Sequence, residues 1–193
     1  MLSDLIRKNR SCRRFYQNKS VDEEELVGLV NLARLSASGA NLQPLVYILS
    51  CEEKTNADIF SCLAWAGYLN DWAGPVEGER PSAYIVMLGD TEISKNLGFD
   101  PGIAGQSILL GAREKGLGGC MLGAVQRDKL SGLLDIPPRY SIPLVIAIGK
   151  PKETVEIETM DAGGSIKYWR DEDDVHHVPK RGLEEIILHF NTP

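Results

Sequence analysis

The chain has 193 residues, 43% of them hydrophobic, so it can bury a substantial core but leaves little room for two full domains. Its 21 Lys and Arg residues against 27 Asp and Glu residues give a net charge of −6, which repels polyanions and disfavours general nucleic-acid binding. We find neither a secretory signal nor a run of about 20 apolar residues, and therefore expect a cytoplasmic protein without a membrane segment.

Cysteine and histidine positions argue against a metal site. The four cysteines lie far apart and form no C-x-x-C pair, so neither a zinc site nor a disulfide framework is indicated, and reduced thiols are expected. His176 and His177 are adjacent, which directs their side chains to opposite faces of an extended segment, and His189 stands alone. The dinucleotide, P-loop, zincin and α/β-hydrolase motifs are also absent.

Residues 20–35 are predicted to form an amphipathic helix. Apolar side chains recur there at helical spacing, and Ser20 and Glu23 stand where a capping box would place them. Residues 46–50 follow as a short apolar run rich in β-forming residues, which is typical of a buried strand.

Two further apolar runs, residues 83–88 and 144–148, are predicted to be buried strands for the same reason. Between them, residues 103–115 carry apolar or small side chains on nearly all sides, and Gly116 follows as a C-cap. We expect this helix to be buried on most sides, at the centre of the fold. The alternation of helical and strand periods predicts one α/β or α+β domain over residues 1–193.

The last third of the chain is more polar. Residues 152–178 are predicted to form an excursion or a hairpin, in which the four acids at 171–174 make a solvated loop rather than a cation site. Leu183, Ile186, Ile187 and Phe190 then recur at helical spacing, which predicts a docked helix at the end of the chain.

Two basic segments are each suited to binding an anion. Three arginines fall within five positions, beginning with Arg10 and Arg13, beside the hydroxyl of Ser11. Such a cluster can bind phosphate through charge-assisted hydrogen bonds, although a solvated basic turn explains this segment better when it is taken alone. Lys180 and Arg181 stand just before the predicted last helix, where a phosphate would meet both charge and N–H donors.

Two other segments are suited to a flat ring. Residues 36–44 are small residues and amides, and Asn41 and Gln43 offer donors and acceptors to a ring edge; a plain turn is the alternative. Residues 116–124 form a glycine-rich apolar strand and turn that can lie against one face of a ring, or that simply allow tight packing of a helix on a sheet.

Taken together and in this order, the four segments resemble those of the nitroreductase-like, FMN-dependent flavoprotein family. Its members show an Arg-x-Ser-x-Arg-type opening, a small-residue loop ending in an amide and Gln-Pro, a Gly-Leu-Gly segment and a late Pro-Lys-Arg. Residues 100–106 are also similar to the start of the family's central helix. The resemblance implies an α+β fold with a mixed central sheet flanked by helices and an FMN site at a homodimer interface.

The resemblance implies that Arg10, Ser11 and Arg13 meet the FMN phosphate, its ribityl chain and the pyrimidine side of the ring. Lys180 and Arg181 would complete the phosphate site. Arg13 is the candidate for stabilising the negative charge that develops near N1 when the flavin is reduced.

The resemblance assigns the other side of the cofactor to two more segments. Ser38, Asn41 and Gln43 would approach the flavin from the partner subunit, so dimerisation would be required for function. Leu122 and Gly123 would bring backbone groups near the N5 edge of the ring.

The activity that the resemblance implies is ping-pong reduction of a nitroaromatic, a quinone or a related small-molecule acceptor, with NADH or NADPH as donor. The flavin N5 would carry the chemistry, and no side chain needs to act as acid or base. One alternative is a specialised flavin enzyme of the same family, acting in dehalogenation, flavin fragmentation or ring dehydrogenation. The other is a non-enzymatic α/β binding module whose basic and glycine-rich segments are ordinary turns.

Overall fold

The structure is a computed structural model that describes residues 1–188 and groups them into two compact units. The first unit contains Met1–Trp65 and Gly74–Lys152, and the second contains Ala66–Ala73 and the chain from Glu153 onward. The expectation of one domain over the whole chain stays a prediction. Within the described residues, the helices are too short or too polar to cross a membrane.

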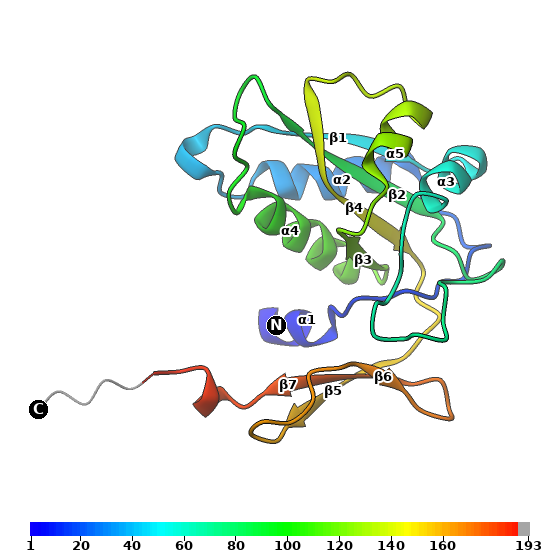
Figure 1. Ribbon diagram of the computed structural model, residues 1–193, viewed down its shortest axis with the longest axis vertical. Helices are drawn as coiled ribbons and strands as arrows, with labels where there is room; N and C mark the ends of the chain where they lie inside the picture. The colour runs from blue at the N-terminus through cyan, green and yellow to red at the C-terminus, as the bar shows by residue number, and fades with distance from the viewer. Residues whose placement is uncertain (189–193) are drawn as a thin grey trace, which may run out of the picture. The chain divides into compact units, whose positions relative to one another are not determined.

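A four-stranded antiparallel sheet forms the framework of the first unit, with the strand order β1-β2-β4-β3 (Figure 1). The strands are β1 (Leu45–Ser50), β2 (Ala83–Asp90), β3 (Gly118–Leu122) and β4 (Tyr140–Gly149). The strands predicted from apolar runs are confirmed as β1, β2 and β4, although β1 is an edge strand and is only half-buried; the glycine-rich segment supplies β3. All eight residues of β2 are buried, as expected for a strand covered on both faces.

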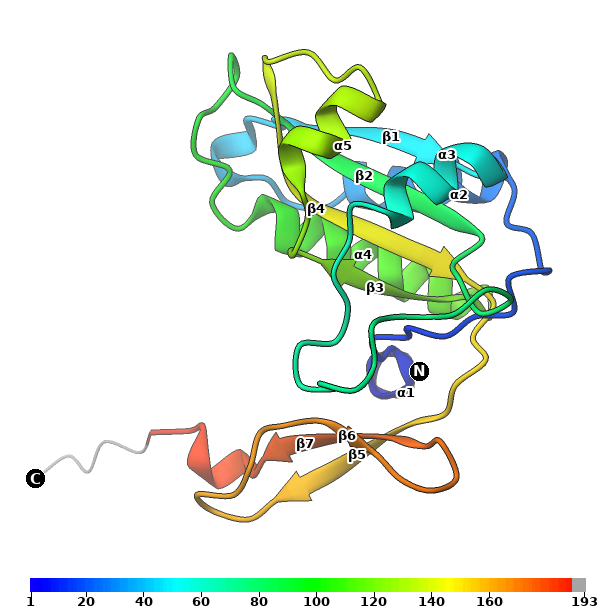
Figure 2. The ribbon, with the colours of Figure 1, turned by 45° about the vertical axis from the view of Figure 1, so that its right-hand side comes forward.

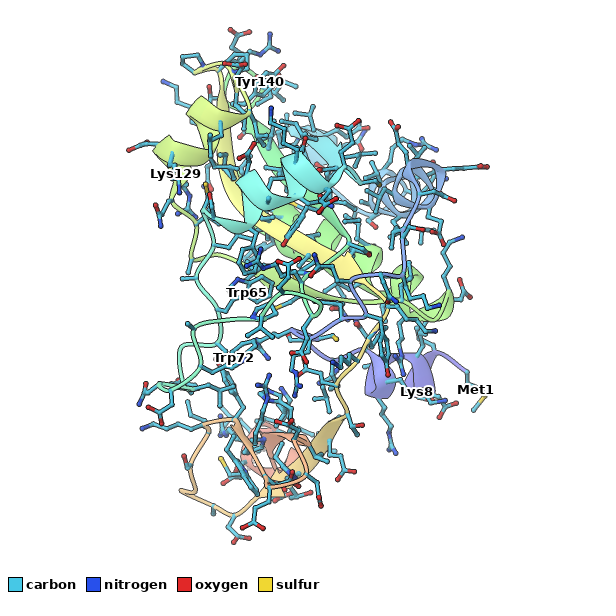
Figure 3. All side chains as sticks on the ribbon, turned by 90° about the vertical axis from the view of Figure 1, so that its right-hand side faces the viewer. Met1, Lys8, Trp65, Trp72, Lys129 and Tyr140 are labelled. Carbon is cyan, nitrogen blue, oxygen red and sulfur yellow. The ribbon has the colours of Figure 1, made fainter. Side chains whose placement is uncertain are left out.

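Helices cover both faces of this sheet (Figure 2). On one face lie α2 (Glu23–Arg34) and α4 (Asp100–Glu114), and on the other lie α3 (Glu53–Phe60) and α5 (Arg127–Leu133). Because successive strand residues point to opposite faces, Ile85 and Met87 of β2 enter the core shared with α2 and α4. A short helix, α1 (Leu2–Lys8), precedes these elements and packs on α4 (Figure 3 labels Met1 and Lys8).

The predicted start of α2 is wrong by three residues. Asp22 is the N-cap, since its carboxylate accepts the backbone N–H of Glu25 at 2.7 Å while its own N–H donates to the Glu25 carboxylate at 3.2 Å. Asp22 and Glu25 therefore form the capping box that was expected to begin at Ser20. An aspartate caps a helix as well as a serine does, so the sequence offered two starts.

The predicted central helix is α4, which begins three residues earlier than expected. Gly116 adopts a φ of +74° just beyond its C-cap, as the sequence indicates. Seven of its fifteen residues are buried, as expected for a central helix, whereas Ile103 and Gln106 lie on an exposed face.

The second unit contains a three-stranded mixed sheet, in which the predicted hairpin is present and a third strand is added to it. Its strands are β5 (Val155–Met160), β6 (Trp169–Arg170) and β7 (His176–Arg181), in the order β5-β7-β6. Strand β7 pairs in parallel with β5 and antiparallel with β6. The α+β class is confirmed; the mixed pairing lies in this sheet, whereas the larger sheet is antiparallel in all its pairs.

Acids and aromatic rings hold the second unit together. The loop between β6 and β7 is ordered by Asp171, whose carboxylate accepts the N–H groups of Asp173 and Val175 at 3.0 and 2.8 Å. Arg170 donates to Glu153 at 3.0 Å and stacks over Trp72 at 4.4 Å from the ring centroid (Figure 3 labels Trp72). This stacking ties the 66–73 segment to the sheet.

Histidines and the chain end complete the second unit. As predicted for an extended pair, His176 is fully buried, while His177 contacts Glu158 at 2.6 Å and Asp171 at 3.0 Å. The predicted last helix is wrong over the described residues: only Leu183–Glu185 form a single 3₁₀ turn, and Phe190 and His189 lie outside the described residues.

Candidate functional site

The arginine segment lies along the free edge of β3. Ser11 forms a parallel bridge with Gly119, and the N–H of Cys12 donates to the Gly119 carbonyl at 2.9 Å. The bridge brings the predicted phosphate segment beside the glycine-rich strand, although the two are more than 100 residues apart in the sequence. Two of the four predicted segments are thus neighbours in the first unit.

Arg14 belongs to the framework of the fold. Its guanidinium donates to both carboxylate oxygens of Glu79, at 2.6 and 2.8 Å, and the ammonium of Lys152 donates to the same carboxylate at 2.8 Å. The hydrogen bonds from Arg14, and then those from Lys152, lower the pKa of Glu79 to about 2. Sequence reasoning missed this anchor, because Glu79 lies 65 residues away in a segment with no recognisable pattern.

Arg10 is a cation without a carboxylate partner among residues 1–188. One guanidinium nitrogen donates to the Ile6 carbonyl at 2.8 Å, while Nε is buried and makes no hydrogen bond within the described chain. Burial lowers the pKa of Arg10. Since a partly desolvated cation is stabilised by a nearby negative charge, the position favours binding of an anion. Arg13 and Ser11 follow on the same segment, with the Ser11 side chain exposed.

The glycine-rich segment serves both purposes that its sequence allowed. Gly119 is required by packing, because a Cβ there would lie 2.4 Å from the Ala147 carbonyl oxygen. Leu122 buries its side chain at the end of β3, whereas Gly123 is exposed and has no atom within 4 Å of an added Cβ. Open space at Gly123 permits a ligand to approach the backbone closely.

Arg127 fixes the turn after β3 and was not recognised in the sequence. Its guanidinium donates to the carbonyls of Gly123 at 3.1 Å and Ile142 at 2.8 Å, with longer bonds to two neighbouring carbonyls. These bonds hold the Gly123 backbone against the start of β4. A basic residue at the beginning of a short helix gives no sequence signal for this role.

The small-residue loop at 36–44 connects α2 to β1 and is anchored to α4. The Ser38 hydroxyl donates to the Asp100 carboxylate at 2.5 Å, and the Gly39 N–H donates to the same group at 2.9 Å. The side chains of Asn41 and Gln43 are exposed. A cavity of about 350 Å³ lies behind the loop and is lined by Ser38, Gln43 and Asp100, among others. Contact of this loop with a partner's flavin stays a prediction.

Lys180 and Arg181 lie in the second unit and differ from the expectation. They are the last residues of β7, and only the single 3₁₀ turn follows, so they do not precede a helix that could supply several N–H donors. Arg181 donates to the Glu185 carbonyl at 2.6 Å, and Lys180 is exposed. As neighbours in a strand, the two side chains point to opposite faces. Their part in a phosphate site stays a prediction.

Comparisons with known proteins agree with this arrangement. Residues 6–67 and 94–150 match the sequence model described as the nitroreductase family, which is more than half of the chain. An Archaeoglobus fulgidus protein, whose name describes it as an NADH dehydrogenase/NAD(P)H nitroreductase, is 26% identical over 166 residues, covering 81% of this chain and 89% of that protein.

Solved structures show the same fold. The nitroreductase family protein of Streptococcus pneumoniae superposes with a TM-score of 0.72 at 17% identity, covering 98% of this chain and 100% of that one. An FMN-dependent nitroreductase of Clostridium difficile superposes with a TM-score of 0.67 at 20% identity, covering 100% and 99%. With the sequence match across the arginine segment, the small-residue loop and the glycine-rich strand, the chain belongs to the nitroreductase family.

Proposed function

We propose that the chain is an FMN-dependent oxidoreductase that uses NADH or NADPH to reduce a nitroaromatic, a quinone or a related small molecule in a ping-pong scheme. The observation that carries the proposal is Arg10, a partly buried cation whose Nε has no partner among residues 1–188. It directly precedes Ser11, which bridges to β3, and the open Gly123 follows that strand. The names of the relatives support the cofactor and the donor, since one is an FMN-dependent nitroreductase and another is linked to NAD(P)H.

The residues of the first unit fit FMN in charge and in hydrogen-bonding capacity. Arg10 supplies a cation for the phosphate, and the exposed Ser11 hydroxyl supplies a donor or acceptor for the ribityl chain. Arg14 is held by Glu79, and we assign Arg13 to the pyrimidine side of the ring. Its positive charge would stabilise negative charge near N1.

The glycine-rich segment would set the position of the ring. Arg127 holds the Gly123 carbonyl, so the backbone at the end of β3 has a fixed orientation. The open space at Gly123 would let the N5 edge come close to the backbone groups of Leu122 and Gly123. Bound there, FMN would supply transfer of electrons from a nicotinamide to the acceptor.

We further propose that two copies of the chain associate and that each completes the other's site. Large apolar side chains are exposed at Val27 and Leu35 in and after α2, and at Phe99 and Ile103 around the start of α4. Exposed apolar side chains of this size favour association. The loop that carries Ser38, Asn41 and Gln43 adjoins these helices and would reach the partner's flavin. Lys180 and Arg181 would complete the phosphate site.

Titration of the FMN-free protein with FMN, followed by quenching of flavin fluorescence, tests the proposal. Wild-type protein should bind with a defined stoichiometry of one FMN per chain. Arg10→Ala should weaken binding by about tenfold or more, because a charge-assisted hydrogen bond contributes about 1.5–3 kcal/mol. Arg7→Ala removes the same charge from the exposed last turn of α1 and is the matched control, with an expected change below about threefold.

The outcomes separate the candidates. Saturable binding that depends on Arg10 and not on Arg7 supports the flavin site. Wild-type protein that binds no FMN at micromolar concentrations would favour the non-enzymatic module, in which the same segments only make turns.

A further inference from the structure

Asp100 makes contacts that its place in the sequence does not require. It is the first residue of α4 and is buried, and its two carboxylate oxygens accept different groups of the same loop. One oxygen accepts the Ser38 hydroxyl at 2.5 Å, and the other accepts the Gly39 N–H at 2.9 Å. Bonds to an ionised acceptor are about twice as strong as those between neutral groups.

The contacts continue from Asp100 through Ser38 into the loop. While the Ser38 hydroxyl donates to Asp100, its oxygen accepts the backbone N–H of Gln43 at 2.9 Å. One carboxylate thus fixes both ends of a five-residue turn, with Gly39 at its start and Gln43 at its end. The hydroxyl proton of Ser38 is used inside the loop and is not available to a ligand.

The loop needs this support because its backbone is strained. Ala40, Asn41 and Gln43 have φ values of +48°, +55° and +52°, in the left-handed region that side-chain-bearing residues adopt only at a cost in free energy. Packing does little to hold the conformation, since a cavity of about 350 Å³ lies behind the loop. Backbone bonds from Asn41 to Ser38 and from Leu42 to Gly39 hold the turn from within, and the bonds to Asp100 fasten it to α4.

We propose that Asp100 is a positioning residue for the flavin site: through Ser38 and Gly39 it preforms the strained loop that presents the Asn41 and Gln43 amides. The proposal rests on the proposed function and refines it. Ser38 acts within the loop, whereas the exposed amides of Asn41 and Gln43 are the groups that meet the cofactor. A loop that Asp100 holds in this conformation without FMN would spare binding the cost of ordering it.

A purely structural role would also place an acid in the first turn of α4, where it complements the helix dipole. Asp128 offers a matched control for that effect. It lies in the first turn of α5 in the same unit, is exposed, and makes no hydrogen bond to a loop among the described residues. Asp128→Ala removes a charge and a helix-terminus interaction without touching the 36–44 loop.

The first measurement is backbone amide hydrogen exchange in FMN-free protein, read by NMR. Asp100→Ala should speed exchange of the Gly39 and Gln43 amides by about tenfold or more, while buried β2 amides such as Val86 keep their protection. Ser38→Ala should speed Gln43 and leave Gly39 protected by Asp100. Asp128→Ala should change neither. Equal exchange at Gly39 and Gln43 in wild type and Asp100→Ala would overturn the proposal, whether or not the protein binds FMN.

The second measurement is the dissociation constant for FMN in the same variants. Asp100→Ala and Ser38→Ala should each raise it by about tenfold, while Asp128→Ala leaves it within about twofold. A loop that loosens in Asp100→Ala with no change in the dissociation constant would overturn the positioning role and leave the proposed flavin site standing. Absence of FMN binding in wild-type protein would instead overturn the proposed function, and the exchange data would still test the loop.

Discussion

Glu79→Gln should lower the free energy of unfolding by about 3 kcal/mol at neutral pH. Glu79 has a side chain that is 12% exposed and accepts hydrogen bonds from Arg14 and Lys152. These bonds lower its pKa from the ordinary 4.5 to about 2, and a difference of that size corresponds to about 3 kcal/mol of stability. Loss of one partner from a buried ion pair costs a similar amount, about 3–5 kcal/mol.

The pH dependence has a defined sign. Because the folded state lowers the pKa of this acid, its contribution is full above pH 4.5 and is lost as the pH falls toward 2. Wild type should therefore lose stability over this range more steeply than Glu79→Gln.

Urea denaturation followed by circular dichroism, at pH 7 and again between pH 5 and 3, measures both effects. Glu77→Gln is the control: its carboxylate pairs with Arg80 at 3.0 Å but is 72% exposed, so the expected loss is below about 1 kcal/mol. A loss below about 1 kcal/mol for Glu79→Gln, or equal losses for the two variants, would refute the reasoning.

Three further predictions follow from local geometry. Gly119→Ala should lower the free energy of unfolding by about 1–3 kcal/mol, because the added Cβ would lie 2.4 Å from a β4 carbonyl oxygen. Gly123→Ala has open space around the added Cβ and should leave the free energy of unfolding unchanged. Equal melting temperatures for the two variants would contradict this prediction. The hydrogen bonds that the His177 ring donates to the carboxylates of Asp171 and then Glu158 raise the pKa of His177, so its stabilisation is full below about pH 6.5 and is lost as the pH rises through the raised pKa. An NMR titration of the ring that gives a pKa at or below 6.5 would count against this. Burial, and then the charge of Asp100, raise the pKa of Tyr47 to about 12. In a pH titration of phenolate absorbance, Tyr47→Phe should therefore lack a step near pH 12 that wild type shows, and the two proteins should have the same steps near pH 10.

Local pattern was enough to predict most of the first unit. The apolar runs of β1, β2 and β4 are long enough to identify buried strands, and α2 and α4 have helical spacing. Helix boundaries were less certain, since Asp22 competes with Ser20 as a cap. In the second unit a hairpin was predicted, and β6 and β7 form one, but the pairing of β5 with β7 was not predicted, because both strands are polar, partly exposed and distant in the sequence.

The site could be predicted only where a segment carries its own signal. Arg10 and Ser11 were singled out by charge and spacing, and the structure does place Ser11 beside β3. Asp100 and Glu79 were missed as partners, because each acts on a loop more than 60 residues away and an acid in the sequence does not reveal what it contacts. Lys180 was expected ahead of a helix, since the hydrophobic spacing of residues 183–190 resembles one; in the structure it ends a strand.

The most direct test of the central claim is the absorbance spectrum of the purified protein under anaerobic conditions, before and after addition of NADH or NADPH. The account predicts flavin bands that bleach on addition of one of these donors, return when a quinone or nitroaromatic acceptor is added, and belong to FMN when the cofactor is released by denaturation. Protein without flavin bands even after reconstitution with FMN, or with bands that neither donor bleaches, would contradict it.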